Sequence, residues 1–298
     1  MFAKGLIAFP ITPMDAGGRV DEAALRRLVR RCADAGVDAV CVLGSTGTYP
    51  FMSRDERRRA IEAAAAELRD RLPLHAGVGA LRTDDAIRHA SDARSAGAAM
   101  GLLAPMSYTP LTEDEVETHF RTVAGEGGLP LAIYDNPAAT HFSISDALIG
   151  RLARVPGIVA VKAPSAPGPD AAGRVVALRS IVPEGFSVGF SGDANAAEVL
   201  IAGADAFYSV LAGLFPQPMV ALRQLVAAGD LGRARGIDRE LMPMWDLMRT
   251  FGGVRVMYAA ANHLGLTDAE PPRPILPLAG EARDRVESAI ERLGETVG

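Results

Sequence analysis

Lys162 is the residue of this sequence whose chemical type is hardest to replace. The 298 residues include 31 lysines and arginines, and only Lys4 and Lys162 are lysines. Lys162 lies in the apolar run 159–163, where a charge is costly and burial favours the neutral amine. A neutral amine attacks carbonyl carbons, which a guanidinium does not do. Lys162 therefore indicates Schiff-base chemistry, although a lysine paired with a buried carboxylate would explain the residue equally well.

Three further polar segments follow apolar runs of the same kind. Tyr134 ends one run, and its hydroxyl could carry a proton to and from a carbon bound to the Lys162 nitrogen. The turn 44–47, Gly-Ser-Thr-Gly, offers hydroxyls and backbone N–H groups to a carboxylate or a proton relay. A third segment, 191–193, is Ser-Gly-Asp. Each feature alone is common in cores and turns, so its meaning depends on whether one fold brings the segments together.

The elements that must position these residues are short β-rich runs that recur about every 20 to 35 residues, a spacing typical of βα units. An Arg/Glu/Ala-rich segment with helical spacing follows each run. Eight runs are present, the number that closes a (β/α)8 TIM barrel. They are Leu6–Ile11, Ala39–Leu43, Leu74–Val78, Gly101–Ala104, Leu131–Tyr134, Ile158–Lys162, Ser187–Phe190 and Ala206–Val210.

The reactive groups of such barrels stand at the carboxyl ends of the strands, so the polar segments are expected at one barrel mouth. Ser53 with Glu56 and Thr112 with Glu115 have the spacing of capping boxes at two helix starts. After the eighth run only helical patterns follow, at about 214–228, 230–249, 252–265 and 280–297. We therefore expect a barrel domain over 1–228 and a C-terminal helical domain over 229–298.

Composition excludes several classes of function. A net charge of −5, with arginines interleaved among acids, gives no basic surface for nucleic acid, and no apolar run is long enough for a membrane span. The N-terminus lacks a cleavable signal pattern, which favours a cytoplasmic protein. Cys32 and Cys41 are expected to fill the core.

The five histidines are scattered without ligand spacing, so no metal site is expected. Only His141 follows a strand closely enough to contact a substrate at the barrel mouth. The alternative for His141 is capping of the next helix, for which Ser143 is the better candidate.

Taken together, these segments resemble the dihydrodipicolinate synthase / N-acetylneuraminate lyase superfamily, class I aldolase-like barrels that act on pyruvate and other 2-oxo acids. The resemblance runs almost end to end and includes the opening motif 9–14 and the closing motif 273–278. It implies that Lys162 forms an imine with a 2-oxo acid and that Tyr134 is the general acid and base. It also implies that Ser45 and Thr46 hold the carboxylate of the 2-oxo acid and relay protons.

The same resemblance implies a homotetramer built from two dimers and no cofactor. Tyr208 occupies the position on the eighth strand that borders the substrate in the family. We expect Gly47 and Gly192, in the turns beside the proposed site, to contact the substrate as well.

Several positions depart from dihydrodipicolinate synthases. Ala139 stands where those enzymes carry an arginine that grips the carboxylate of aspartate semialdehyde, and Thr48 and Ala163 replace glutamates. Ser107 replaces a tyrosine that completes the proton relay of a neighbouring subunit, a role that Tyr108, one residue on, could take.

Without the arginine clamp, an aldehyde partner or leaving group that needs no arginine-held carboxylate is favoured. The leading prediction is thus a lyase that uses a 2-oxo acid in a sugar-acid aldol reaction or in a dehydration. One alternative is 4-hydroxy-tetrahydrodipicolinate synthase, which joins pyruvate to aspartate semialdehyde. An alternative of another class is a non-catalytic barrel that binds a 2-oxo acid or a sugar acid.

Overall fold

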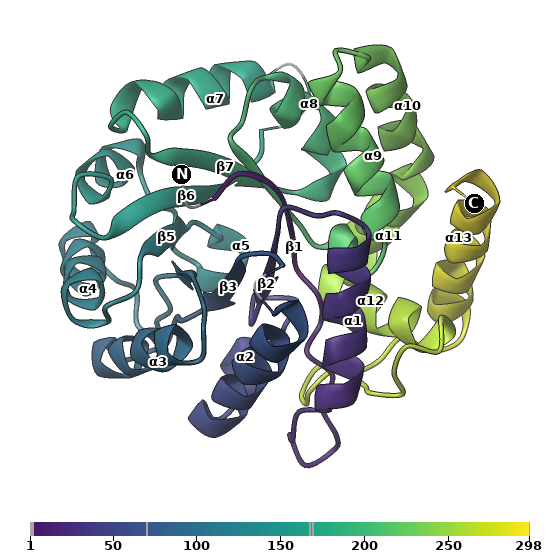
Figure 1. The fold of residues 1–298 in the computed structure, drawn as a ribbon, viewed down its shortest axis with the longest axis horizontal. Coiled ribbons are helices and arrows are strands. Elements are labelled where there is room, and N and C mark those ends of the chain that lie inside the picture. Colours follow the sequence, from purple (N-terminus) through teal and green to yellow (C-terminus); the bar gives the residue numbers. More distant parts are fainter. Residues whose placement is uncertain (1–2, 70, 167, 169, 298) are drawn as a thin grey trace.

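Eight parallel strands close into a barrel in sequence order, with β8 pairing back onto β1 (Figure 1). The structure is a computed structural model that describes residues 3–69, 71–166, 168 and 170–297. The predicted (β/α)8 barrel is confirmed. The strands are β1 Gly5–Ala8, β2 Ala39–Val42, β3 Leu74–Gly77, β4 Met100–Leu103, β5 Leu131–Tyr134, β6 Ile158–Pro164, β7 Ser187–Ser191 and β8 Ala206–Ser209.

Side chains alternate between the barrel interior and the surrounding helices, as the period of a strand requires. On β6, Val161 and Ala163 belong to the hydrophobic core between the barrel and its surrounding helices. Ala160 belongs to a second cluster of buried residues, which fills the barrel interior and is called the interior cluster below. Lys162 shares the interior face with Ala160. Cys41 of β2 also belongs to the interior cluster, and Cys32 lies on the buried face of the helix Glu22–Asp34. Both are buried free thiols, as predicted for core residues.

Helices surround the strands (Figure 1). Thr112 forms the predicted capping box with Glu115, whose carboxylate accepts the Thr112 backbone N–H at 2.7 Å. Only half of the capping box predicted at Ser53 forms. The Ser53 hydroxyl accepts the backbone N–H of Glu56, but the Glu56 carboxylate accepts the backbone N–H of Val20 at 2.7 Å and not that of Ser53. The helices of this part are α1 Glu22–Asp34, α2 Arg54–Leu68, α3 Thr83–Ser95, α4 Glu113–Glu126, α5 Pro137–Thr140, α6 Asp146–Leu152, α7 Asp170–Ile181, α8 Ala196–Ile201 and α9 Pro216–Ala227.

The chain ends in the predicted helical part, which begins with α10 (Leu231–Glu240) packed against α9 (Figure 1). The single helix expected over 230–249 is wrong, since α10 ends at Glu240 and α11 starts anew. Pro243 lies in the first turn of α11, where its missing N–H is tolerated, but it would disrupt the interior of a continuous helix. The domain boundary at 228/229 stays a prediction. The helices are α10 Leu231–Glu240, α11 Met242–Phe251, α12 Gly253–His263 and α13 Glu281–Val297.

Candidate active site

A cavity of about 530 Å³ lies at the carboxyl ends of the strands. Segments that follow β2, β5, β6, β7 and β8 contribute to its wall, together with α11. The structure thus brings together segments separated by more than a hundred residues, as expected for a barrel mouth. Of the predicted site residues, the cavity is lined by Ser45, Thr46, Tyr134, Lys162, Gly192 and Tyr208.

Lys162 faces aromatic rings. Its Nζ lies 3.7 Å from the ring centroid of Tyr134, 5.3 Å from that of Phe9 and 6.0 Å from that of Tyr208. The residue is 5% exposed, and within the described residues it takes part in no ion pair. Among the described residues, no carboxylate therefore lies within ion-pair distance of Lys162, which disfavours the alternative of a direct pair with a buried carboxylate. An amine in such surroundings is suited to attack a carbonyl.

The ring of Tyr208 reaches this place because β7 carries a glycine. Gly189 is the register partner of Lys162, and a Cβ at Gly189 would lie 2.5 Å from Cε2 of Tyr208. Any larger side chain would displace the ring, so Gly189 shapes the floor of the cavity.

Tyr134 belongs to a closed triangle of hydrogen bonds. Its hydroxyl lies 3.0 Å from Oγ of Ser45, and Nδ2 of Asn136 donates to both oxygens, at 3.0 Å to Tyr134 and 3.1 Å to Ser45. Ser45 comes from the turn after β2, whereas the other two residues come from the end of β5. The hydroxyl pair that the sequence predicts as a proton relay is thus in hydrogen-bond contact.

Two polar groups at the floor of the cavity have unused hydrogen-bonding capacity. Oδ2 of Asp193 accepts the backbone N–H groups of Val210 and Leu211 at 3.0 and 3.2 Å, while Oδ1 has no partner among the described residues. Burial raises the pKa of Asp193 to about 6, against the lowering effects of its hydrogen-bonding neighbours and, more weakly, of the charge of Lys162. The Tyr208 hydroxyl also lacks a described partner, and burial raises its pKa. Both groups could hydrogen-bond a ligand.

Two predicted site residues are not in the cavity wall. Gly47 allows a tight turn, because a Cβ there would lie 2.9 Å from the backbone nitrogen of Leu43. Tyr108 is 97% exposed on the loop after β4 and does not line the cavity of its own chain. The neighbouring Ser107 hydroxyl donates to the carbonyl of Thr109 within the same loop.

His141 also does not line the cavity. It ends α5 in the left-handed conformation, with φ of 56°. The cap of the next helix is Ser145, which accepts the N–H of Leu148 at 3.1 Å, so the expected cap at Ser143 is wrong by two residues. Ile144 lies between the two serines outside the helix, and its N–H donates to the Asp135 carboxylate at 3.4 Å and not to a helix cap.

Sequence reasoning missed the contribution of α11. Trp245, Met248 and Arg249 line the cavity, one helical turn apart, and Arg249 also pairs with Asp246 on the same helix. Arg249 and Lys162 are the cationic residues of the described wall. The spacing of 245, 248 and 249 indicated a helix face but not what that face covers.

Asn136 is a second site residue that the sequence does not reveal, because nothing in its type signals contact with both hydroxyls.

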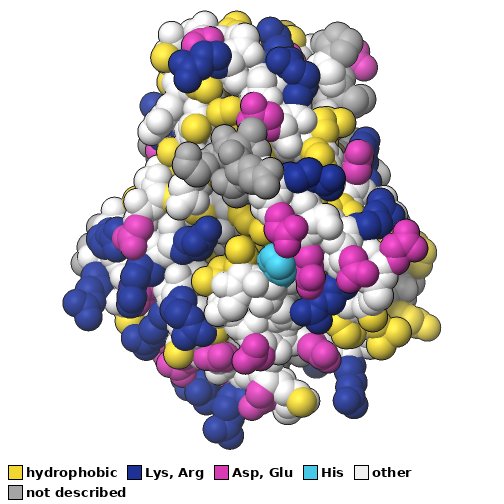
Figure 2. Space-filling model, turned by 90° about the vertical axis from the view of Figure 1, so that its right-hand side faces the viewer, with side chains coloured by type: hydrophobic (Ala, Val, Ile, Leu, Met, Phe, Trp, Pro, Cys, Tyr) yellow, Lys and Arg dark blue, Asp and Glu magenta, His cyan; other side chains and the backbone are white. Residues whose placement is uncertain are grey.

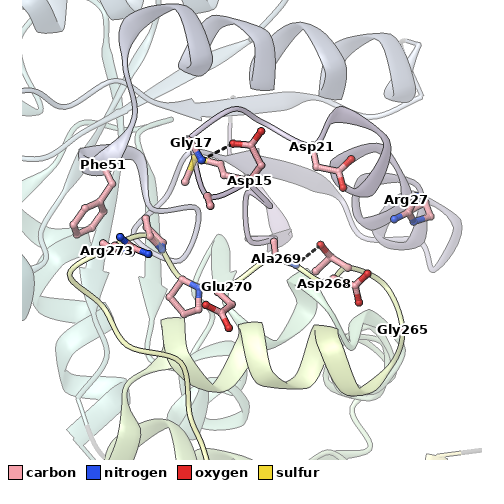
Figure 3. Close-up of a pocket in the computed structure, with 16 residues that line it drawn as sticks. Asp15, Gly17, Asp21, Arg27, Phe51, Gly265, Asp268, Ala269, Glu270 and Arg273 are labelled. Carbon is pink, nitrogen blue, oxygen red and sulfur yellow. Dashed lines mark hydrogen bonds between the residues drawn. The ribbon is translucent and has the colours of Figure 1, made fainter.

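A larger hollow of about 780 Å³ lies elsewhere, between the loop that carries Asp15 and the segment 265–273 (Figure 3). Figure 3 shows Arg27, Glu270 and Arg273 around it. Its described lining includes neither lysine nor tyrosine, and several of its carboxylates are used locally; Asp15, for example, accepts the N–H of Gly17 at 2.9 Å. Size alone therefore does not make this hollow the reactive site.

Within the described residues, no three His, Cys, Asp or Glu side chains are grouped as metal ligands, and no helix has the length and apolarity of a membrane span. On the face seen in Figure 2, basic and acidic side chains are both spread over the surface. These observations agree with the mixed charge pattern of the sequence.

Comparison with known proteins gives a consistent result. Residues 2–293 match the model of the dihydrodipicolinate synthetase family. A 4-hydroxy-tetrahydrodipicolinate synthase of Methylococcus capsulatus is 32% identical over 98% of this chain and 99% of its own, and one of Acidiphilium cryptum is 34% identical over 99% of each. The crystal structure of a dihydrodipicolinate synthase from Agrobacterium tumefaciens superposes with a TM-score of 0.95, at 52% identity over 98% of each chain.

Proposed function

The chain belongs to the dihydrodipicolinate synthetase family, and on that premise we propose that Lys162, Tyr134 and Ser45 carry its reaction. It is a Schiff-base-forming lyase of the class I aldolase type that acts on pyruvate or a related 2-oxo acid. The observation that supports these roles best is the position of the Lys162 amine, 3.7 Å from the ring of a tyrosine whose hydroxyl contacts Ser45.

In the proposed reaction, the neutral amine of Lys162 attacks the carbonyl carbon of the 2-oxo acid, and loss of water gives the imine. Tyr134 moves protons to and from the substrate, with Ser45 as its relay partner at 3.0 Å. Thr46 is 4% exposed in the turn beside Ser45, where its hydroxyl and the backbone N–H groups suit the carboxylate of the substrate.

Reductive trapping tests the imine. Borohydride added in the presence of pyruvate should attach a three-carbon mass to the protein at Lys162. Lys162→Arg should lose that adduct while keeping the positive charge. An adduct undiminished in Lys162→Arg would refute the assignment of the lysine, and a wild-type protein without any adduct would refute the imine itself.

The second substrate is proposed from a departure in sequence. We propose an aldol reaction or dehydration of a sugar-acid-type substrate, because Ala139 stands where dihydrodipicolinate synthases carry a carboxylate-binding arginine, and alanine cannot supply a bidentate clamp. The alternative, 4-hydroxy-tetrahydrodipicolinate synthase, is favoured by the names of the relatives. Under that alternative, Arg249, which α11 contributes to the cavity wall, would have to bind the carboxylate of aspartate semialdehyde.

A screen of aldehydes in the presence of pyruvate, in which the loss of pyruvate is measured, separates the sugar-acid hypothesis from the 4-hydroxy-tetrahydrodipicolinate synthase hypothesis. Rapid turnover of aspartate semialdehyde would support the alternative, and turnover confined to hydroxylated aldehydes would support the sugar-acid reading. The non-catalytic barrel is the least supported hypothesis, since the relatives named above are synthases.

We further propose a homotetramer in the cytoplasm. Large apolar side chains are exposed on loops that follow three consecutive strands: Phe51 after β2, Leu81 after β3 and Tyr108 after β4. Such side chains are candidates for burial against a second copy, in which Tyr108 could approach the partner's cavity. Light scattering tests this proposal, because a monomeric mass at micromolar concentration would contradict it.

A further inference from the structure

Asn136 makes contacts that the reaction proposed above does not use. Its amide nitrogen donates to the hydroxyl oxygens of both Tyr134 and Ser45, at 3.0 and 3.1 Å. We propose that Asn136 is a positioning residue of the proton relay, which holds the two hydroxyls in contact and stabilises the phenolate form of Tyr134 during proton transfer. The proposal rests on the roles given to Tyr134 and Ser45.

The backbone fixes where the Asn136 side chain points. Asn136 precedes Pro137, which opens the short helix α5 and limits the conformation of the residue before it. The Asn136 carbonyl accepts the N–H groups of Ala139 and Thr140, each at 3.0 Å, and the Thr140 hydroxyl at 3.0 Å. These three hydrogen bonds to the Asn136 carbonyl fix the backbone of this residue after β5. The side-chain amide is therefore carried by a fixed segment of backbone.

The triangle has a definite proton count. Each hydroxyl oxygen has two lone pairs and one proton, and Asn136 occupies one lone pair on each oxygen. If Ser45 donates to Tyr134, both lone pairs of the tyrosine oxygen are filled and its own proton is directed outward. If Tyr134 donates to Ser45, the serine proton is the one left free. In either arrangement the pair has one proton to give to the cavity.

The amide also limits the groups between which protons can be transferred. Its nitrogen carries two hydrogens and accepts no proton, so a proton cannot leave the relay through Asn136. Protons therefore pass among Tyr134, Ser45, the molecule in the cavity and solvent that enters the cavity, but not through the amide. When Tyr134 gives its proton to the substrate, its oxygen keeps two donors, Nδ2 of Asn136 and Oγ of Ser45, and hydrogen bonds to a charged oxygen are about twice as strong as neutral ones.

The position of Lys162 supports the same role. Its amine lies against the face of the Tyr134 ring, so the phenol has the lysine on one side and the amide of Asn136 at its oxygen. Once Lys162 is consumed as an imine, the amide remains as a donor that the reaction does not alter.

Exchange of the methyl hydrogens of pyruvate for deuterium tests the proposal without knowledge of the second substrate. In D2O the imine loses a proton from the methyl carbon to the relay, and a deuteron from solvent returns to that carbon. Proton NMR follows the loss of the methyl signal. Asn136→Leu keeps approximately the shape of the side chain without donors, and Asn136→Asp keeps the shape but offers only acceptors.

Both variants should exchange pyruvate about tenfold to a hundredfold more slowly than the wild type, the effect of one lost hydrogen bond to a charged group. Asn136→Asp should be the slower, because its negative charge lies beside the forming phenolate. Both should still give the borohydride adduct at Lys162 on long incubation. Thr140→Val is the matched control, since it loosens the same segment by removing the bond to the Asn136 carbonyl but leaves the amide, and it should exchange pyruvate at nearly the wild-type rate.

The outcomes separate this inference from the proposed function. A wild type without adduct and without exchange would refute the proposed function. A wild type active in both assays, with Asn136→Leu exchanging within about twofold of it, would overturn the role of Asn136 alone. A loss in Thr140→Val as large as that in Asn136→Leu would also overturn it, because the loss would then reflect the segment and not the amide.

Discussion

Lys162 and Tyr134 are register partners on neighbouring strands, and this pairing places the Lys162 Nζ 3.7 Å from the centroid of the tyrosine ring. Paired positions of parallel strands direct their side chains to the same face of the sheet, here the barrel interior. The amine and the phenol are therefore positioned by the barrel itself, and a site built on strands is held more precisely than one built on loops.

Removal of the Tyr134 hydroxyl should separate proton transfer from imine formation. Tyr134→Phe keeps the ring that faces Lys162 but loses the bonds to Ser45 and Asn136. We expect turnover of pyruvate with an accepted aldehyde to fall about a hundredfold or more, as for the loss of a general acid or base. The borohydride adduct should persist on long incubation. Turnover within about threefold of the wild type would exclude Tyr134 from the relay.

Gly189→Ala should damage the cavity floor. The added Cβ would lie 2.5 Å from Cε2 of Tyr208, which must then move into the space beside Lys162. We expect a loss of about 1 to 3 kcal/mol in the free energy of unfolding, the usual cost of overpacking, together with weaker trapping of pyruvate. Urea unfolding measures the first effect.

Gly232→Ala is the control for this change, because nothing lies within 4 Å of the place of its Cβ on α10. It should be neutral or stabilising by up to about 1 kcal/mol, as for glycine replaced inside a helix. Equal effects of the two substitutions would show that contact with Tyr208 does not matter.

Features of the fold and site that depend on local sequence could be predicted, whereas features that arise from the packing of distant segments could not. Tyr134 was predictable because it ends an apolar strand, and strand ends in a barrel meet at one mouth. Lys162 was predictable for the same reason, although β6 continues two residues beyond its predicted end, to Pro164. Ser45 was predictable from a turn after such a strand. The break between α10 and α11 was missed although Pro243 marks it, because the apolar spacing continues across it.

The remaining features depend on how distant segments meet. Arg249 lies on α11, and helical spacing says which residues share a face but not that the face covers the barrel mouth. Asn136 contacts both hydroxyls only because the fold brings Oγ of Ser45, in the turn after β2, within 3.1 Å of its Nδ2. The exposure of Tyr108 depends on the path of a loop, which residue type does not fix.

Arg249 should determine affinity for a second substrate that carries a carboxylate. Arg249→Gln removes the guanidinium from the cavity wall, so we expect KM to rise about tenfold for aldehydes with a distal carboxylate, with little change in kcat. Aldehydes without that group should be unaffected. Arg233→Gln is a matched control, since Arg233 also pairs with an aspartate three residues away, on α10, but does not line the cavity. An equal rise for both classes of aldehyde would contradict the role of Arg249.

Asp193 should make stability depend on pH in a direction opposite to that of a salt-bridged carboxylate. Burial raises its pKa in the folded state to about 6 from the ordinary 3.8, so between these values the folded chain binds more protons than the unfolded one. Its contribution to stability is therefore present at low pH and is lost as the pH rises through this window. Asp193→Asn cannot ionise and should lack this loss.

The measurement is urea unfolding of the wild type and Asp193→Asn at about pH 4.5 and about pH 7.5, where linkage predicts that their difference in unfolding free energy changes by about 2 kcal/mol in favour of the variant. Other titrating groups cancel in this double difference. Oδ1 has no partner among the described residues, so an amide group in its place changes the absolute stability, but this amide does not titrate and leaves the pH dependence unaffected. A difference that stays constant between the two pH values would mean that Asp193 is charged in the folded state throughout, held so by Lys162.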